Sequence, residues 1–164
     1  MEETLKILNQ LEREGVLSEY AIGGAMAAMF YAEPVSTFDL DVFMLLPEQR
    51  GILTLTPLYE TLHAMGFKEH GECVMIEGVP VQFLPAYNAL LEDALKQAIE
   101  TQYESTPTRV MRAEHLIAIC LQTGRTKDRE RVRLLREEAA IDDDMLRSIV
   151  QKHGLEERWR QWNP

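Results

Sequence analysis

The segment Ile22-Gly23-Gly24, followed by Ser36-Thr37-Phe38-Asp39-Leu40-Asp41-Val42, decides the expected fold of this chain. An apolar run that ends in two glycines predicts a short strand and a tight turn, and the second stretch has the composition of another strand. Side chains alternate between the two faces of a strand, so Asp39 and Asp41 are expected on the same face. Their carboxylates can therefore converge on one cation or on an adjacent pair of cations.

A glycine turn next to paired carboxylates is typical of a metal and phosphate site. Oxygen ligands suit Mg²⁺, and two divalent ions about 3.5–4 Å apart hold the attacking and leaving oxygens in phosphoryl and nucleotidyl transfer. Gly23 and Gly24 have no Cβ, so backbone N–H groups are expected to approach a phosphate at the start of a short helix over residues 25–31. The alternative is an exposed strand face with solvated charges, which explains the aspartates but not the glycines.

The composition is that of an acidic globular protein. The chain has 164 residues, of which 46% are hydrophobic, and a formal net charge of −10. This length predicts one domain with a substantial core. The negative charge argues against a general nucleic-acid coat, because affinity for phosphate backbones comes from Lys and Arg. Basic residues are nevertheless concentrated between Arg109 and Arg136.

The cysteines and the apolar segments favour a cytoplasmic protein without a membrane partner. Cys73 and Cys120 are far apart and form no Cys-x-x-Cys pair, so neither a disulfide framework nor a zinc site is expected. The N-terminus lacks the pattern of a signal peptide. The most apolar stretch, residues 21–32, is too short and too interrupted by glycine to cross a bilayer.

The hydrophobic pattern predicts an α/β fold in which a parallel or mixed sheet is flanked by helices. Helices are expected from about residue 5 to near residue 15 and over residues 25–31, 56–65 and 88–101, and strands over residues 20–22, 38–46, 67–69, 73–76 and 79–84. Thr56 is the expected N-cap of one helix and Asn88 of another. Glu77-Gly78 is expected to form the two-residue turn of a hairpin.

The second part of the chain is expected to be wholly helical. Residues 104–108, which contain Pro107, have the composition of a linker. Helices follow over residues 113–123 and 127–139, and a last helix begins at the cap Asp142 and stops at Gly154. We therefore expect an α/β core over residues 1–104 and a C-terminal helical extension over residues 105–164, packed on the core as one compact unit.

The glycine turn, the short helix and the pattern Thr37-x-Asp39-x-Asp41 resemble the core motif of the nucleotidyltransferase superfamily. In that motif a Gly-Gly or Gly-Ser turn precedes an Asp-x-Asp strand. The segment from Arg109 to Asp128 is similar to the helical segment of small bacterial nucleotidyltransferases related to the AbiEii toxins. The resemblance covers most of residues 20–140, although only the glycine and Asp-x-Asp parts are specific.

The resemblance implies a mixed sheet with flanking helices and a Mg²⁺ ion held by the catalytic carboxylates Asp39 and Asp41. It also implies transfer of a nucleoside monophosphate from a nucleoside triphosphate to an acceptor. The residues expected to bind the nucleotide are Gly23, Gly24, Ser36, Thr37, Arg125 and Lys127. For the two basic residues, the alternative is a solvated helix face that binds no ligand.

Two positions depart from the pattern of the family. Active members commonly add a third carboxylate from a neighbouring strand, and the matching position here is Gln82. A neutral amide cannot act as a general base or balance the charge of a second Mg²⁺. A lysine that often precedes the Gly-Arg turn is matched here by Cys120.

The sequence therefore leaves several functions open. One is a Mg²⁺-dependent nucleotidyltransferase, whose acceptor is a small antibiotic-like molecule, a tRNA end or a protein hydroxyl. Another is a catalytically degenerate fold that binds nucleotide, RNA or a protein partner, such as an antitoxin or a second copy of the chain. The third is a structural or assembly domain without a ligand.

Overall fold

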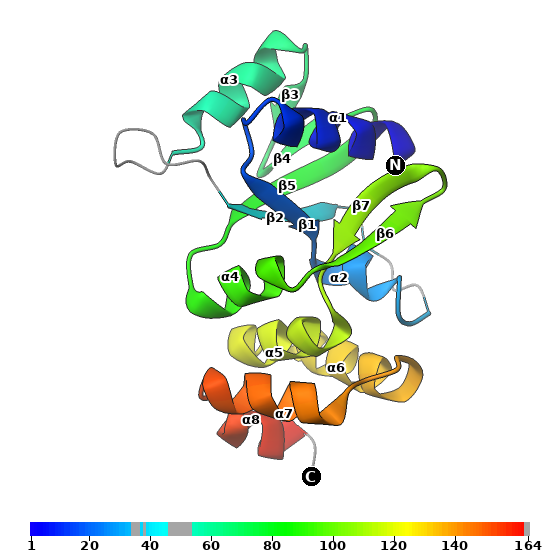
Figure 1. Ribbon diagram of the computed structural model, residues 1–164, viewed down its shortest axis with the longest axis vertical. Helices are drawn as coiled ribbons and strands as arrows, with labels where there is room; N and C mark the ends of the chain where they lie inside the picture. The colour runs from blue at the N-terminus through cyan, green and yellow to red at the C-terminus, as the bar shows by residue number, and fades with distance from the viewer. Residues whose placement is uncertain (34–36, 38, 46–53, 163–164) are drawn as a thin grey trace.

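The computed structural model describes residues 1–33, 37, 39–45 and 54–162. One mixed sheet runs through the molecule, with helices around it (Figure 1). The strands are β1 (Glu19–Ile22), β2 (Leu40–Leu45), β3 (Lys68–His70), β4 (Cys73–Ile76), β5 (Val79–Pro85), β6 (Ile99–Tyr103) and β7 (Thr106–Val110). The helices are α1 (Glu2–Arg13), α2 (Gly24–Ala28), α3 (Thr56–Ala64), α4 (Ala89–Lys96), α5 (Ala113–Thr123), α6 (Thr126–Glu138), α7 (Asp143–Lys152) and α8 (Glu156–Trp162).

Strand β2, which contains Asp41 and directly follows Asp39, lies in the middle of the sheet. The strand order is β3-β4-β5-β2-β1-β7-β6, with β2 antiparallel to β1 and parallel to β5. Leu40, Val42 and Met44 are fully buried, so one face of β2 is anchored in the core. The predicted mixed sheet with flanking helices is confirmed.

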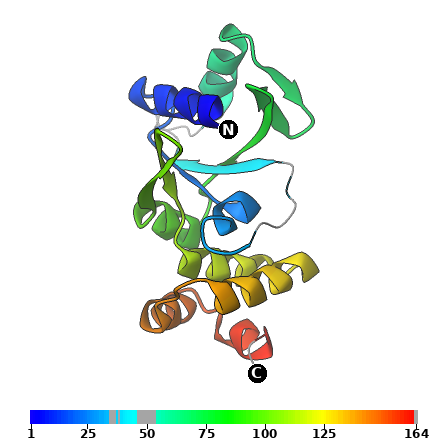
Figure 2. The ribbon, with the colours of Figure 1, turned by 90° about the vertical axis from the view of Figure 1, so that its right-hand side faces the viewer.

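The C-terminal helices form a separate layer at one end of the molecule. Both ribbon views place α5 and α6 between the sheet and the outer helices α7 and α8 (Figures 1 and 2). Helix α1 lies at the other end, where Leu5, Leu8 and Leu11 are fully buried on one face. In the described part of the chain, no helix has the length and apolar character that crossing a membrane requires.

The chain between α4 and α5 is the main departure from the predicted fold. The helix predicted over residues 88–101 ends at Lys96, and the predicted linker over residues 104–108 is the turn and the beginning of a strand in the hairpin β6–β7. In β6 the side chains alternate between half-buried and exposed, and Glu104 has a positive φ of 52° in the turn. The sheet therefore continues to Val110, and the helical part begins at Ala113.

Other predictions differ only at the ends of elements. The helix predicted over residues 25–31 stops at Ala28, and β3 begins at Lys68, one residue later than expected. Leu55, not Thr56, is the N-cap of α3. Helix α8 was not predicted at all.

Several local predictions are confirmed. Glu77 and Gly78 have positive φ angles of 49° and 80°, as a tight hairpin turn requires. Asn88 accepts a hydrogen bond from the Leu91 amide, and Asp142 caps α7. The division of the chain into a core and an extension that pack as one unit stays a prediction.

Asp93 connects α4 to the helical layer. It accepts a hydrogen bond of 2.9 Å from Lys152 of α7, and its Oδ2 lies 3.7 Å from Nε2 of His115 in α5. Burial opposes the ionised form of Asp93, but the hydrogen bonds from Lys152, Gln97 and His153 lower its pKa to about 2. His115 is fully buried and its ring nitrogens have no hydrogen-bond partner among the described residues, so burial lowers its pKa.

We predict that the folded state loses stability as the pH falls from 7 to 5. The pKa of His115 is lowered on folding, so the unfolded chain binds this proton more readily, and the loss begins near the ordinary histidine pKa of about 6.5. The free energy of unfolding should fall by about 1 kcal/mol from this residue. Urea denaturation should show a smaller pH dependence in His115→Leu, whereas the exposed His70→Leu control should keep it. An identical slope in both variants would contradict the assignment.

Candidate functional site

The two glycines bring the backbone close to the aspartate strand. Gly24 has a φ of 60°, and a Cβ on this residue would overlap the Oδ2 atom of Asp41. A Cβ on Gly23 would overlap the ring of Phe43, and the Gly23 amide donates a hydrogen bond of 2.9 Å to the Asp41 carbonyl. Glycine is required at both positions because the side chains of β2 occupy the space of a Cβ. The turn thus fixes the place of the Asp41 carboxylate.

The two carboxylates share one site at the beginning of β2. Asp39 directly precedes the strand, and Thr37 Oγ1 donates a hydrogen bond of 3.1 Å to its Oδ1. Burial raises the pKa of Asp41, and the charge of Asp39 raises it further. Repulsion of this kind disfavours two bare carboxylates, so a cation between them would lower the free energy of the ionised pair.

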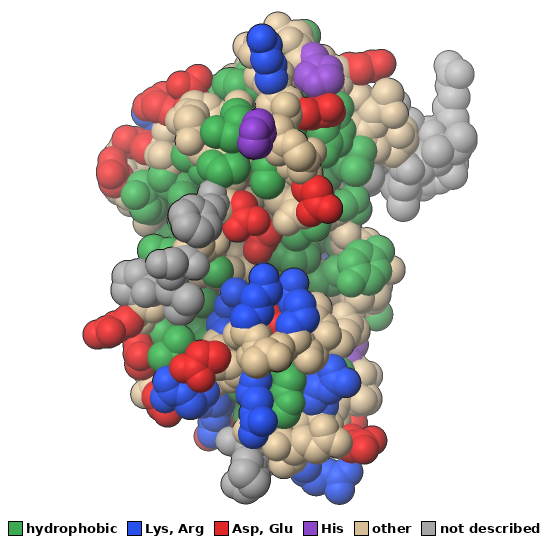
Figure 3. Space-filling view, turned by 180° about the vertical axis from the view of Figure 1, so that it is seen from behind, with side chains coloured by type: hydrophobic (Ala, Val, Ile, Leu, Met, Phe, Trp, Pro, Cys, Tyr) green, Lys and Arg blue, Asp and Glu red, His purple; other side chains and the backbone are tan. Residues whose placement is uncertain are grey.

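A cavity of about 360 Å³ lies over the carboxylates. It is lined by Ala25, Thr37, Asp39, Asp41, Gln82, Arg125, Lys127, Glu130, Arg131 and Leu134. One wall therefore comes from the sheet and α2, and the other comes from α6. On the face seen in Figure 3, Lys and Arg side chains gather beside Asp and Glu side chains. The cavity combines an acidic wall and a basic wall, as a site for a metal and a polyphosphate would.

Most of the residues predicted for the site meet in this cavity. Thr37, the two aspartates, Gln82, Arg125 and Lys127 all line it, and Gly24 lies directly against Asp41. Ser36 lies outside the described residues. The amide of Gly23 was predicted to bind a phosphate, but in the structure it donates to the backbone carbonyl of Asp41.

Arg131 and Glu130 also line the cavity and were not among the predicted site residues. Arg131 follows Lys127 by four residues in α6, so the two share one face of the helix. This four-residue spacing from Lys127 could have predicted that Arg131 lines the same site. Arg133, which lies on another face, pairs instead with Glu130 and Glu137 at 2.6 and 2.5 Å.

Gln82 lies where a third carboxylate was expected. In the parallel pair β2–β5 it is the direct neighbour of Asp41. Its Nε2 donates a hydrogen bond of 3.2 Å to Oε2 of Glu72, an exposed residue just before β4. Within the described ranges, no group of three or more His, Cys, Asp or Glu side chains could hold a metal ion. Among the described residues, Asp39 and Asp41 are therefore the candidate metal ligands of this cavity.

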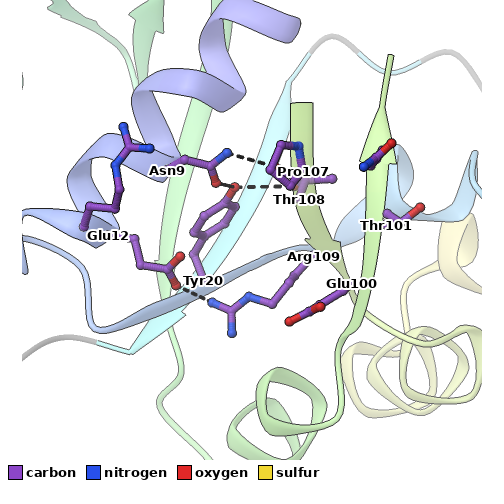
Figure 4. A pocket seen from close by; sticks show the side chains of 10 residues that line it. Asn9, Glu12, Tyr20, Glu100, Thr101, Pro107, Thr108 and Arg109 are labelled. Atoms are coloured by element: carbon purple, nitrogen blue, oxygen red, sulfur yellow. Dashed lines mark hydrogen bonds and ion pairs between the residues drawn. The ribbon is translucent and has the colours of Figure 1, made fainter. Parts of the chain in front are cut away.

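A larger cavity of about 500 Å³ lies elsewhere, between α1 and the strands β1, β7 and β6 (Figure 4). Tyr20 donates a hydrogen bond of 2.6 Å to Asn9 there, and Arg109 pairs with Glu12. Glu12 and Glu100 both line this cavity, but Glu12 is neutralised by Arg109, and the described residues that line the cavity include no glycine. The smaller cavity is the better candidate for a functional site.

The fold is similar to solved structures of nucleotidyltransferases. ANT(2'')-Ia in complex with adenylyl-2''-tobramycin is 16% identical and gives a TM-score of 0.54 over 94% of this chain and 98% of that chain. An antigenic nucleotidyltransferase-like protein from Paracoccidioides brasiliensis is 15% identical, with a TM-score of 0.58 over 96% of this chain and 92% of that one. No family model and no curated protein matches the sequence. The chain thus has a nucleotidyltransferase-like fold, and the kinship with AbiEii toxins stays a prediction.

We predict that Gly24→Ala destabilises the protein more than Gly15→Ala, a substitution at a glycine with a positive φ and open space around it. A positive φ costs an alanine about 1–2 kcal/mol at any position, and at Gly24 the new Cβ must also displace the Asp41 carboxylate. Gly15→Ala is the matched control, because Gly15 has a φ of 72° and nothing within 4 Å of its Cβ position. Chemical denaturation should show the larger loss in Gly24→Ala. Equal losses would mean that Asp41 does not depend on this contact.

Proposed function

We propose that this protein is a Mg²⁺-dependent nucleotidyltransferase that moves a nucleoside monophosphate from a nucleoside triphosphate to an acceptor. The observation that carries the proposal is the cavity in which Asp39 and Asp41 face the basic side chains of α6. The donors fit Mg²⁺, because both are carboxylates and the pKa of Asp41 is raised by burial and by its acidic neighbour. The nucleotidyltransferase-like fold supports the same reaction class.

Each wall of the cavity has its own role in this proposal. Asp39 and Asp41 hold the metal ion, which when bound neutralises phosphate charge and helps to orient the triphosphate. Thr37 holds the Asp39 carboxylate through its hydroxyl. Arg125 and Lys127 bind the phosphate chain from α6. The predicted phosphate contacts of Ser36 and of Gly24 belong to the proposal as well, whereas the Gly23 amide already donates to the Asp41 carbonyl.

The reaction exchanges one phosphorus–oxygen bond for another. A hydroxyl oxygen of the acceptor attacks the α-phosphorus, the bond to the bridging oxygen breaks, and pyrophosphate leaves. Positioning and charge neutralisation provide most of the catalysis in such transfers. The hydroxyl proton must pass to a base or to solvent, and the amide of Gln82 cannot accept it.

The acceptor belongs to one of three classes. The name of the ANT(2'')-Ia complex describes an adenylylated tobramycin, so for that protein a small hydroxyl-bearing molecule is modified. We include such a molecule, a tRNA end and a protein hydroxyl among the candidates for this chain.

The free thiols of Cys73 and Cys120 fit the proposed cytoplasmic location.

A second candidate function is a binding module that holds a nucleotide, an RNA or a protein partner without turnover. Gln82 favours it, since this amide occupies the position next to Asp41. An antitoxin or a second copy of the chain would be the protein partner. Calorimetric binding of a triphosphate with Mg²⁺, combined with no transfer over a broad acceptor panel, would support this function.

We expect the double variant Asp39→Asn, Asp41→Asn to lose Mg²⁺-dependent labelling of an acceptor by a radiolabelled nucleoside triphosphate. Removing both charges removes the metal ligands, so labelling should fall by about a hundredfold or more. Asp144→Asn is the control, because its side chain is 90% exposed and belongs to α7. Unchanged labelling in the double variant would refute the proposed enzyme.

We also expect Gln82→Glu to increase turnover. The new carboxylate would lie beside Asp41 and accept a proton, and general acid–base catalysis contributes about 10²–10⁴-fold in enzymes. Steady-state transfer rates should rise by about tenfold or more. Gln102→Glu adds the same charge on the exposed side of β6 and should have no effect. A rate equal to that of wild type would show that a carboxylate at position 82 is not what limits catalysis.

A further inference from the structure

A buried carboxylate lies directly behind the basic wall of the cavity. Asp128, in the first turn of α6, is fully buried. Burying an ionised carboxylate is costly unless it is paired and hydrogen-bonded. Burial alone would raise the pKa of Asp128, but hydrogen bonds from Arg125 and Thr123 lower it. Asp128 is therefore held in its charged form by its neighbours.

Arg125 makes several contacts with this carboxylate. Its Nε and Nη2 atoms donate hydrogen bonds of 2.8 and 3.2 Å to the two oxygens of Asp128, and its backbone amide donates a third of 3.2 Å. A bidentate pair of this kind fixes the plane of the guanidinium. The side chain of Arg125 is 56% exposed, so Asp128 is the main restraint on where it points.

Arg131 approaches the same carboxylate from the next turn of α6. Its Nη1 lies 3.7 Å from Oδ1 of Asp128, and its side chain is only 15% exposed. Among the cations that lower the pKa of Asp41, Arg131 has the largest effect. Arg131 is therefore close to Asp128, and it lines the same cavity as Asp41.

The turn that carries these groups is fixed from behind. Thr123 Oγ1 donates a hydrogen bond of 2.6 Å to Asp128. Gly124 has a φ of 70°, and a Cβ there would overlap the guanidinium of Arg158, which donates to the Leu121 carbonyl at 3.0 Å. The C-terminal helix α8 thus packs under the turn between α5 and α6, and Asp128 sits on a rigid support.

We propose that Asp128 is a positioning residue that holds Arg125 and Arg131 together as a clamp on a polyphosphate chain. This inference rests on the proposed function, whose cavity both arginines line. Two guanidinium groups repel each other, and the shared carboxylate offsets that repulsion while leaving other N–H donors free for phosphate oxygens. Asp128 is the N3 residue of the capping box of α6, and this role alone would not need the charge, because a neutral Gln serves at N3 as Glu does.

The test uses the full chain and inorganic tripolyphosphate, measured by calorimetry at low ionic strength. Asp128→Asn keeps the shape of the side chain but removes its charge, so the affinity should fall by about tenfold. Arg131→Gln should also weaken binding, and the double variant should lose less than the sum of the two losses, because both changes disrupt one clamp. Asp142→Asn, at the cap of α7, is the matched control and should bind like wild type.

Arg125→Lys tests the clamp without touching a buried group. Lysine keeps the charge but cannot make the bidentate contact, so affinity should fall severalfold even if Asp128→Asn does not fold. Wild-type affinity in Arg125→Lys or in a folded Asp128→Asn, additive losses in the double variant, or no tripolyphosphate binding by wild type would each overturn the inference. Wild type that binds tripolyphosphate but transfers no nucleotide would contradict only the proposed enzyme, and the clamp would stand.

Discussion

The contact between Gly24 and the Asp41 carboxylate is the constraint on which the rest of the site depends. The carboxylate occupies the space that a Cβ on Gly24 would need, and Gly24 must take a positive φ to turn the chain into α2. The same turn is tied to β2 through the amide of Gly23. The turn and the carboxylate thus share one space, and any side chain larger than glycine at position 24 would displace the carboxylate.

This fixed negative charge requires a counter-charge, and the helical layer provides one. The pKa of Asp41 is raised by burial and by Asp39, while Arg131, Arg125 and Lys127 lower it. These cations belong to α6 and its N-cap, whereas the aspartates belong to the sheet region. Electrostatic attraction therefore acts across the cavity in addition to the apolar packing of the two layers. A ligand with both a cation and a polyphosphate would satisfy both walls at once.

The sequence alone predicts the part of the site whose residues lie close together along the chain. The glycine pair, Asp39 and Asp41 lie within 19 residues that contain α2 and the beginning of β2, and alternation along a strand is a local property. Arg131 was missed because the face of α6 that meets the sheet depends on tertiary packing. The hairpin β6–β7 was missed because the segment from Ile99 to Tyr103 continues a helical pattern, and only pairing with β7 decides its conformation.

Gln82, the neighbour of Asp41 in β5, is the position at which the proposed metal binding and the proposed catalysis can be told apart. Its register beside Asp41 gives it access to the same cavity, so it can orient a ligand by hydrogen bonding. Its side-chain amide, however, donates to Glu72, which places a carboxylate one hydrogen bond away from the cavity wall. Gln82 itself cannot accept a proton that is released in the cavity, because a neutral amide is not a base. The proposed transfer therefore depends on where that proton goes, whereas the proposed binding of a phosphate ligand does not.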